Sequence, residues 1–123
     1  TPNTFGIYGV NLVMKWIEDQ GGVDAVEKNN RDKAGILYDK LDSSDFFTPH
    51  ATKDSRSLMN VTWRLPNEDL EKQFIAEALK DDLSGLKGHR SVGGIRASIY
   101  NAMPKEGVEA LVDFMGEFER KNG

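Results

Sequence analysis

The residues best suited to chemistry lie in the nine-residue stretch 88–96. It holds three potential cations, His89, Arg90 and Arg96, together with three glycines. Glycine allows backbone N–H groups to turn toward a bound anion, and the side chains of His89 and Arg90 can add charge-assisted hydrogen bonds. The stretch therefore predicts an anion site, although a tight turn with a solvated arginine has the same sequence pattern.

Arg96 belongs to an alternating segment that is typical of a strand. Ile95, Ala97 and Ile99 share one apolar face, so Arg96 should point to the opposite face. A guanidinium held on a rigid element suits two-point capture of a carboxylate. Together with the loop cations, it predicts a ligand with two anionic ends.

Other polar residues give weaker signals. Asn3 and Thr4 precede a predicted helix, whose N-terminus could hold a phosphate, yet simple helix capping explains the same pattern. His50 lies in a polar loop near Asp54, which is too few ligands for a metal site. The spacing indicates no nucleophile beside a base and no pair of carboxylates for acid–base catalysis. We therefore predict no catalytic residue and no metal ligand in this chain.

Hydrophobic periodicity predicts the elements that position these residues. Helices are expected at 4–20, at 22–41, from residue 67 and from residue 104, and strands at 46–47, 57–65, 83–86 and 95–100. This order indicates an α+β fold, in which a small, mostly antiparallel sheet of three or four strands carries helices packed on one face.

The same patterns predict which side chains are buried. The expected core positions beyond the 95–100 strand are Met59, Val61, Trp63, Leu65, Leu70, Phe74, Ala78, Leu79, Val108, Leu111, Val112, Met115 and Phe118. The helix 22–41 should bury Val23, Val26, Ala34, Leu37, Tyr38 and Leu41, and expose Glu27, Lys28, Arg31, Asp32 and Lys33. Trp16 also lies on an apolar pattern, which predicts core packing.

The first predicted helix is unusually apolar. Nine of the thirteen residues at 5–17 are apolar, and only Lys15 among them is charged. Such a helix requires burial on all sides, for which a small domain has little interior. We therefore expect residues 1–21 to pack on upstream sequence or on a second subunit, and 22–123 to form a small domain. A buried central helix is the alternative.

Composition narrows the classes of partner. The chain has 16 Lys and Arg against 20 Asp and Glu, giving a net charge of −4, which argues against a nucleic-acid binder. The absence of cysteine excludes disulfides and thiolate sites and fits a reducing compartment. No apolar run is long enough to predict a membrane span. Because the first residue is Thr1 rather than methionine, we also expect further sequence upstream.

Three stretches closely resemble one enzyme family. They are 1–8, 55–62 and 85–102, of which the last contains Gly-His-Arg-Ser-Val-Gly-Gly-Ile-Arg. They resemble phosphoserine aminotransferases, which are class V pyridoxal-phosphate-dependent enzymes. The resemblance extends from the first residue to the last helix, so the chain is identified as the C-terminal portion of such a protein.

The resemblance implies a fold, a reaction and an assembly. The family has the aspartate-aminotransferase type of fold and is a cytoplasmic homodimer. It transfers an amino group between glutamate and 3-phosphohydroxypyruvate, which gives phosphoserine and 2-oxoglutarate. This is a step of serine biosynthesis, and in many bacteria the enzyme also serves pyridoxine biosynthesis.

The resemblance also assigns roles to individual residues. His89 and Arg90 match the positions that hold the substrate phosphate, and Arg96 matches the arginine that holds its carboxylate. Asn3 and Thr4 match the pair that reaches the phosphate of pyridoxal phosphate across the dimer interface. The family's Schiff-base lysine precedes the Thr-Pro-Asn-Thr motif, so this chain alone is expected to be inactive and not to bind the cofactor covalently.

Two other functions remain open from the residues alone. The cations of 88–96 also suit a stand-alone binding module for a small phosphorylated acid. The apolar segment 5–17 also suits a structural or dimerising piece with an exposed helix.

Overall fold

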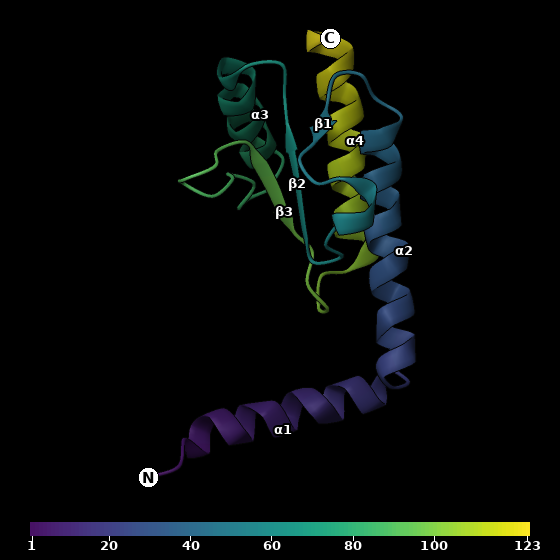
Figure 1. Ribbon diagram of the computed structural model, residues 1–123, viewed down its shortest axis with the longest axis vertical. Coiled ribbons are helices and arrows are strands. Elements are labelled where there is room, and N and C mark those ends of the chain that lie inside the picture. The colour runs from purple at the N-terminus through teal and green to yellow at the C-terminus, as the bar shows by residue number, and fades with distance from the viewer.

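The computed structural model describes all residues, 1–123, and has the predicted α+β class. Figure 1 shows its helices, strands and termini. The elements in chain order are α1 Thr4–Asp19, α2 Val23–Asp42, β1 Thr48–Pro49, the short 3₁₀ helix η1 Lys53–Ser55, β2 Asn60–Arg64, α3 Glu68–Lys80, β3 Ile95–Ser98 and α4 Lys105–Asn122. The four predicted helices are therefore confirmed.

Two predicted strands are wrong. Residues 46–47 form a bend before β1, because the Ser44 hydroxyl accepts the N–H groups of Phe46 and Phe47 at 3.0 and 3.2 Å. Residues 83–86 are irregular, because Asp82 and Gly85 have φ values of 61° and 75°, which interrupt an extended chain. After them only an isolated bridge pairs residue 87 with β3.

The three strands form one antiparallel sheet in the order β1-β2-β3. In the register of β2 and β3, Thr62 lies opposite Arg96 and Trp63 lies opposite Ile95. Trp63 and Ile95 point to the buried face, whereas Thr62 and Arg96 lie on the opposite face and are half-buried. The predicted strand 57–65 begins later than expected because the Ser57 hydroxyl accepts two N–H groups in a turn.

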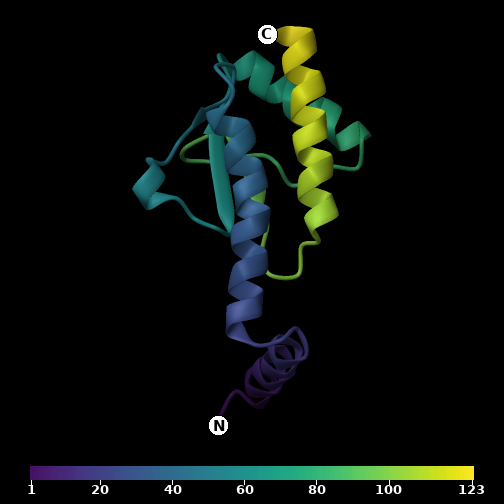
Figure 2. The same ribbon diagram turned by 90° about the vertical axis from the view of Figure 1, so that its right-hand side faces the viewer.

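The core lies between the buried face of the sheet and the helices. Figures 1 and 2 show α2 and α4 side by side along this face, with α3 near the far end of α4. Phe74 of α3 is fully buried, and its ring centroid lies 5.1 Å from that of Phe118 and 6.2 Å from that of Trp63. Edge-to-face contacts of this kind favour a specific packing of the aromatic rings.

Most predicted core positions are confirmed. The buried ones are Val61, Trp63, Leu65, Phe74, Ala78, Ile95, Ala97, Ile99, Val108, Leu111, Met115 and Phe118. Leu79 was wrongly predicted, since it is 61% exposed on the outer side of α3. Val23 at the start of α2 is also exposed, whereas Ala34, Leu37 and Leu41 are buried as expected.

Lys33 was wrongly predicted to be solvated. Its side chain is fully buried, and its Nζ donates to the carbonyls of Ile99, Tyr100 and Met103 at 3.4, 2.8 and 2.9 Å. These carbonyls belong to the turn between β3 and α4. The Tyr100 carbonyl also accepts the Met103 N–H at 2.9 Å, whereas the Ile99 and Met103 carbonyls have Lys33 as their donor. Burial lowers the pKa of Lys33 from its ordinary value.

Helix α1 projects away from the rest of the molecule (Figure 1). The chain turns sharply between α1 and α2 at Gly21 and Gly22, whose φ values are 99° and 91°. None of its residues is buried, and Phe5 is 87% exposed. Trp16, predicted to lie in a core, is 36% exposed because the chain supplies no layer over this helix. No helix of the structure has both the length and the apolarity that crossing a bilayer requires.

Candidate functional site

The cationic stretch forms a closed loop, residues 88–94, at the end of the sheet. The Gly88 N–H donates to the Gly94 carbonyl at 2.9 Å and closes the loop. Inside it, the carbonyl of His89 accepts the N–H groups of Val92 and Gly93 at 2.9 and 2.7 Å. The loop is thus a hydrogen-bonded turn that leads directly into β3.

Its glycines are required by close approach as well as by conformation. Gly94 has φ 70°, and a Cβ there would lie 2.9 Å from the Trp63 carbonyl oxygen. A Cβ on Gly88 would lie 2.0 Å from the Gly93 carbonyl oxygen. The inner surface of the loop is therefore filled by protein atoms, and an anion has to approach from its outer surface.

The outer surface of the loop presents His89, Arg90 and Ser91 to solvent. The backbone N–H groups of His89 and Arg90 donate to no acceptor in the chain. The Nδ1 of His89 lies 2.6 Å from the Ser91 hydroxyl, which fixes the orientation of the imidazole. Two free N–H donors beside a guanidinium and an imidazole form a group that suits an anion with several oxygens.

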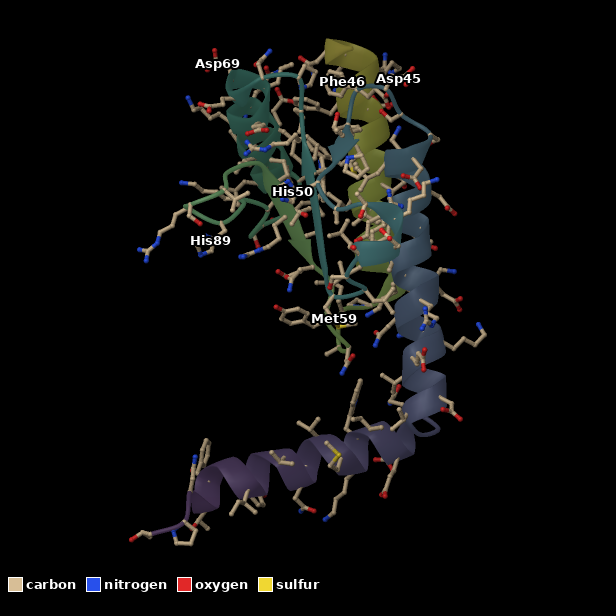
Figure 3. The ribbon with its side chains drawn as sticks, in the orientation of Figure 1. Asp45, Phe46, His50, Met59, Asp69 and His89 are labelled. Carbon is tan, nitrogen blue, oxygen red and sulfur yellow. The ribbon has the colours of Figure 1, made fainter.

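Two neighbouring hollows meet at His89. One, of about 450 Å³, is lined by residues that include Arg64, Lys87, His89 and Arg90. The other, of about 150 Å³, is lined by residues that include His50, Thr62, His89 and Arg96. Arg90 lines only the first hollow and Arg96 only the second, whereas His89 and Arg64 line both. Figure 3 shows His89 on the loop that projects from the sheet, with His50 nearer the strands.

Arg96 lies on the face of β3 that the alternation predicted. Its neighbours Ile95 and Ala97 are buried in the core, while Arg96 is half-buried and lines the smaller hollow. Its Nε is enclosed and has no hydrogen-bond partner. No acceptor in the chain bonds its other guanidinium N–H groups either, so these are free to bind an acceptor in that hollow.

Sequence reasoning missed Arg64, which contacts the loop, and Glu71, which holds Arg64. Arg64 of β2 donates from Nη2 to the Val92 carbonyl, and its Nη1 lies 3.5 Å from the Glu71 carboxylate. Glu71 is buried although it stands in the first turn of α3. The alternation of β2 does place Arg64 on the polar face beside Thr62, but it gives no sign of a contact with residues almost thirty positions later.

Asn3 and Thr4 lie apart from this site, at the free end of α1 (Figure 1). The Asn3 side chain accepts the Gly6 N–H at 2.9 Å, which is a helix cap, and the Thr4 hydroxyl donates to the Pro2 carbonyl at 3.4 Å. The Phe5 N–H has no acceptor. The helix end therefore has a free N–H donor, and neither hollow at His89 is lined by Asn3 or Thr4.

The chain's own lysines do not complete a cofactor site there. Lys15 lies about 16 Å further along α1 than Thr4, from the helical rise. The Nζ of Lys33 is occupied by three carbonyls. Neither lysine therefore places an amine beside Asn3 and Thr4. No group of three metal-ligating side chains gathers anywhere in the chain.

Comparisons with known proteins find one enzyme family. The family model described as aminotransferase class-V matches residues 1–111. The phosphoserine aminotransferase of Desulfosudis oleivorans is 63% identical over 124 residues, which cover 100% of this chain and 34% of that protein. That of Geobacillus kaustophilus is 59% identical over 122 residues, covering 98% of this chain and 34% of that protein.

Solved structures of similar fold belong to the same family. Phosphoserine aminotransferase from Bacillus circulans subsp. alkalophilus superposes with a TM-score of 0.94 at 54% identity, covering 100% of this chain and 34% of that one. The pyridoxal-phosphate-bound enzyme from Trichomonas vaginalis gives 0.87 at 41% identity, covering 94% of this chain and 34% of that one. The chain thus spans about a third of the length of the curated relatives it matches. From the family match over most of its residues, this chain belongs to the class V aminotransferase family.

Proposed function

We propose that the chain is the C-terminal part of a phosphoserine aminotransferase. The parent enzyme would transfer an amino group between glutamate and 3-phosphohydroxypyruvate, giving phosphoserine and 2-oxoglutarate. The names of the curated relatives support this reaction. The observation that carries it within the chain is the position of His89, which lines one hollow with Arg90 and a second hollow with Arg96.

In this proposal the two hollows bind the two ends of one substrate. His89, Arg90 and the free N–H groups of the loop would hold the phosphate, because several donors match its several oxygens. Arg96 would hold the carboxylate, because its guanidinium extends from β3, lines the smaller hollow and bonds no acceptor of this chain. The residues of this chain would then bind and orient the substrate, while the groups that react with it would come from the rest of the parent enzyme.

Pyridoxal phosphate is the proposed cofactor, and a homodimer in the cytoplasm is the proposed assembly. One relative is described as bound to pyridoxal phosphate. Asn3 and Thr4 would contact its phosphate from the N-terminus of α1, where the helix dipole favours an anion. When bound, the cofactor supplies the electron sink for amino transfer. The exposed apolar surface of α1 would be covered by the large domain or by the second subunit.

The chain alone should not catalyse the reaction, since no lysine stands beside Asn3 and Thr4. The test compares the isolated chain with the full-length protein that contains it, each supplied with pyridoxal phosphate, glutamate and 3-phosphohydroxypyruvate. We expect phosphoserine only from the full-length protein. Turnover by the isolated chain would refute the proposed division of roles, and no turnover by the full-length protein would refute the proposed activity.

The roles of the arginines are tested by substitution in the full-length protein. Arg96→Met should raise the KM for phosphoserine by roughly a hundredfold, because it removes a charge-assisted two-point contact. Arg56→Met is the matched control, since Arg56 forms a two-point pair with Asp42 and lines neither hollow. Equal kinetics for the two variants would refute the assignment of Arg96.

A further inference from the structure

Arg64 connects three parts of the fold that meet at the 88–94 loop. Its backbone lies at the end of β2, and its Nη2 donates to the Val92 carbonyl within the loop. Its Nη1 reaches the carboxylate of Glu71 on α3. A guanidinium can donate to these two acceptors at once because it is planar and its N–H groups point in fixed, different directions.

Glu71 holds the other side of this arrangement. It is buried, with Oε2 3.5 Å from Arg64 Nη1, and its Oε1 lies 3.4 Å from the Leu65 backbone N–H. It stands in the first turn of α3, where the helix dipole favours a carboxylate. Breaking the pair would leave Glu71 as a buried charge without its cation, which is strongly unfavourable.

The loop glycines lie directly against the Arg64 side chain. A Cβ on Gly93 would lie 3.1 Å from Arg64 Nη1, and a Cβ on Gly94 would lie 3.1 Å from its Cδ. Both glycines have positive φ, 77° and 70°. The sequence pattern suggested that these glycines face an anion, whereas in the structure they accommodate the arginine.

We propose that Arg64, held by Glu71, is a positioning residue for the phosphate end of the substrate. It fixes the 88–94 loop from the inside, and the loop in turn presents His89 and Arg90 on its outer surface. Because both ends of its guanidinium are engaged by protein acceptors, Arg64 acts through the loop. This inference rests on the proposed function, since it assigns Arg64 to the binding of that substrate.

The first test measures the loop itself. Amide hydrogen exchange in this chain is followed at Gly88, Val92 and Gly93, the three N–H groups that donate to backbone carbonyls within the loop. Arg64→Met should speed their exchange by roughly tenfold or more, because it removes a charge-assisted hydrogen bond from Val92. The amides of α4 and the control Arg56→Met should keep their unmodified rates.

The second test measures the substrate. In the full-length protein, Arg64→Met should raise the KM for phosphoserine by roughly tenfold, with kcat changed by less than about twofold. Arg64→Lys should behave like Arg64→Met, because a single ammonium cannot bridge Glu71 and Val92 as the guanidinium fork does. Arg56→Met is again the control.

The outcomes separate the possible roles of Arg64. An unchanged loop exchange in Arg64→Met overturns the proposal, and so does a faster exchange with an unchanged KM. If Arg64→Lys keeps the original KM while Arg64→Met loses it, the charge of residue 64 contacts the phosphate directly, which also overturns the positioning role. If the unmodified full-length protein gives no turnover, the proposed function fails, and the substrate role of Arg64 fails with it even if the exchange result holds.

Discussion

Replacing Lys33 by methionine should destabilise the fold measurably. The substitution keeps an unbranched side chain but removes the donor from the Ile99 and Met103 carbonyls, which lie 3.4 and 2.9 Å from Nζ and accept no other N–H. The Tyr100 carbonyl keeps the Met103 N–H as its donor. An unpaired buried carbonyl costs about 1–3 kcal/mol, so two cost about 2–6 kcal/mol. Two effects reduce this cost: water reaches the partly buried Met103 carbonyl, and the variant no longer buries an ammonium. We therefore expect the free energy of unfolding to fall by about 2–3 kcal/mol.

The assay is urea unfolding of this chain followed by circular dichroism. Lys28→Met is the matched control on the same helix, because the side chain of Lys28 is 76% exposed and forms only a surface pair with Asp32, worth about 0.3–0.5 kcal/mol. In thermal unfolding the Lys33 variant should melt about 10 °C lower. A stability within about 0.5 kcal/mol of the control would refute the role of Lys33 in holding the turn after β3.

The same residue predicts a pH dependence. Burial places the folded pKa of Lys33 below its ordinary value of 10.5, so between those two pKa values the unfolded chain binds more protons than the folded one. The contribution of Lys33 to the free energy of unfolding therefore rises as the pH increases through this window. The difference in stability between the unmodified chain and Lys33→Met should grow over the same range, and a constant difference would contradict the burial of an ammonium.

Three further predictions concern stability. Gly94→Ala should destabilise the fold by about 2 kcal/mol, because φ is 70° and the new Cβ would meet the Trp63 carbonyl. Gly35→Ala should stabilise it by up to about 1 kcal/mol, because a Cβ at this position in α2 meets open space. Urea unfolding of both variants checks this contrast. Phe74→Ala should cost about 3–5 kcal/mol in the same assay, because it empties the centre of the aromatic core. Hydrogen bonds from Lys40 and Ser44 hold the pKa of Glu119 below its ordinary value of 4.5. Glu119→Gln should thus cost about 1 kcal/mol near pH 7, and the deficit should shrink as the pH falls below 4.5 through the folded pKa, which acid titration of unfolding would detect.

Periodicity was sufficient for the helices and for the apolar face of the sheet. The prediction for Lys33 was wrong because it followed the charge of the residue rather than its spacing. Asn30, Lys33 and Leu37 follow the spacing of the buried face of α2, and that spacing was the available signal. The turn that supplies acceptors to Lys33 lies about seventy residues later, so the sequence alone could not show that a charge would be satisfied there.

The site was predictable in part for a similar reason. Alternation placed Arg96 on the correct face of β3, because strand geometry is local. The contact of Arg64 with the 88–94 loop depends on the path of the chain through α3, which no local pattern specifies. The apolarity of α1 correctly indicated a helix without a layer over it in this chain, and its assignment to a large domain or a second subunit stays a prediction.

A crystal structure of the full-length protein with phosphoserine bound tests most directly whether one substrate spans the two hollows. We expect the phosphate within hydrogen-bond distance of His89, Arg90 and the free N–H groups of the loop, and the carboxylate on Arg96. A ligand bound elsewhere, or one whose phosphate lies on Arg96, would contradict the proposed binding mode.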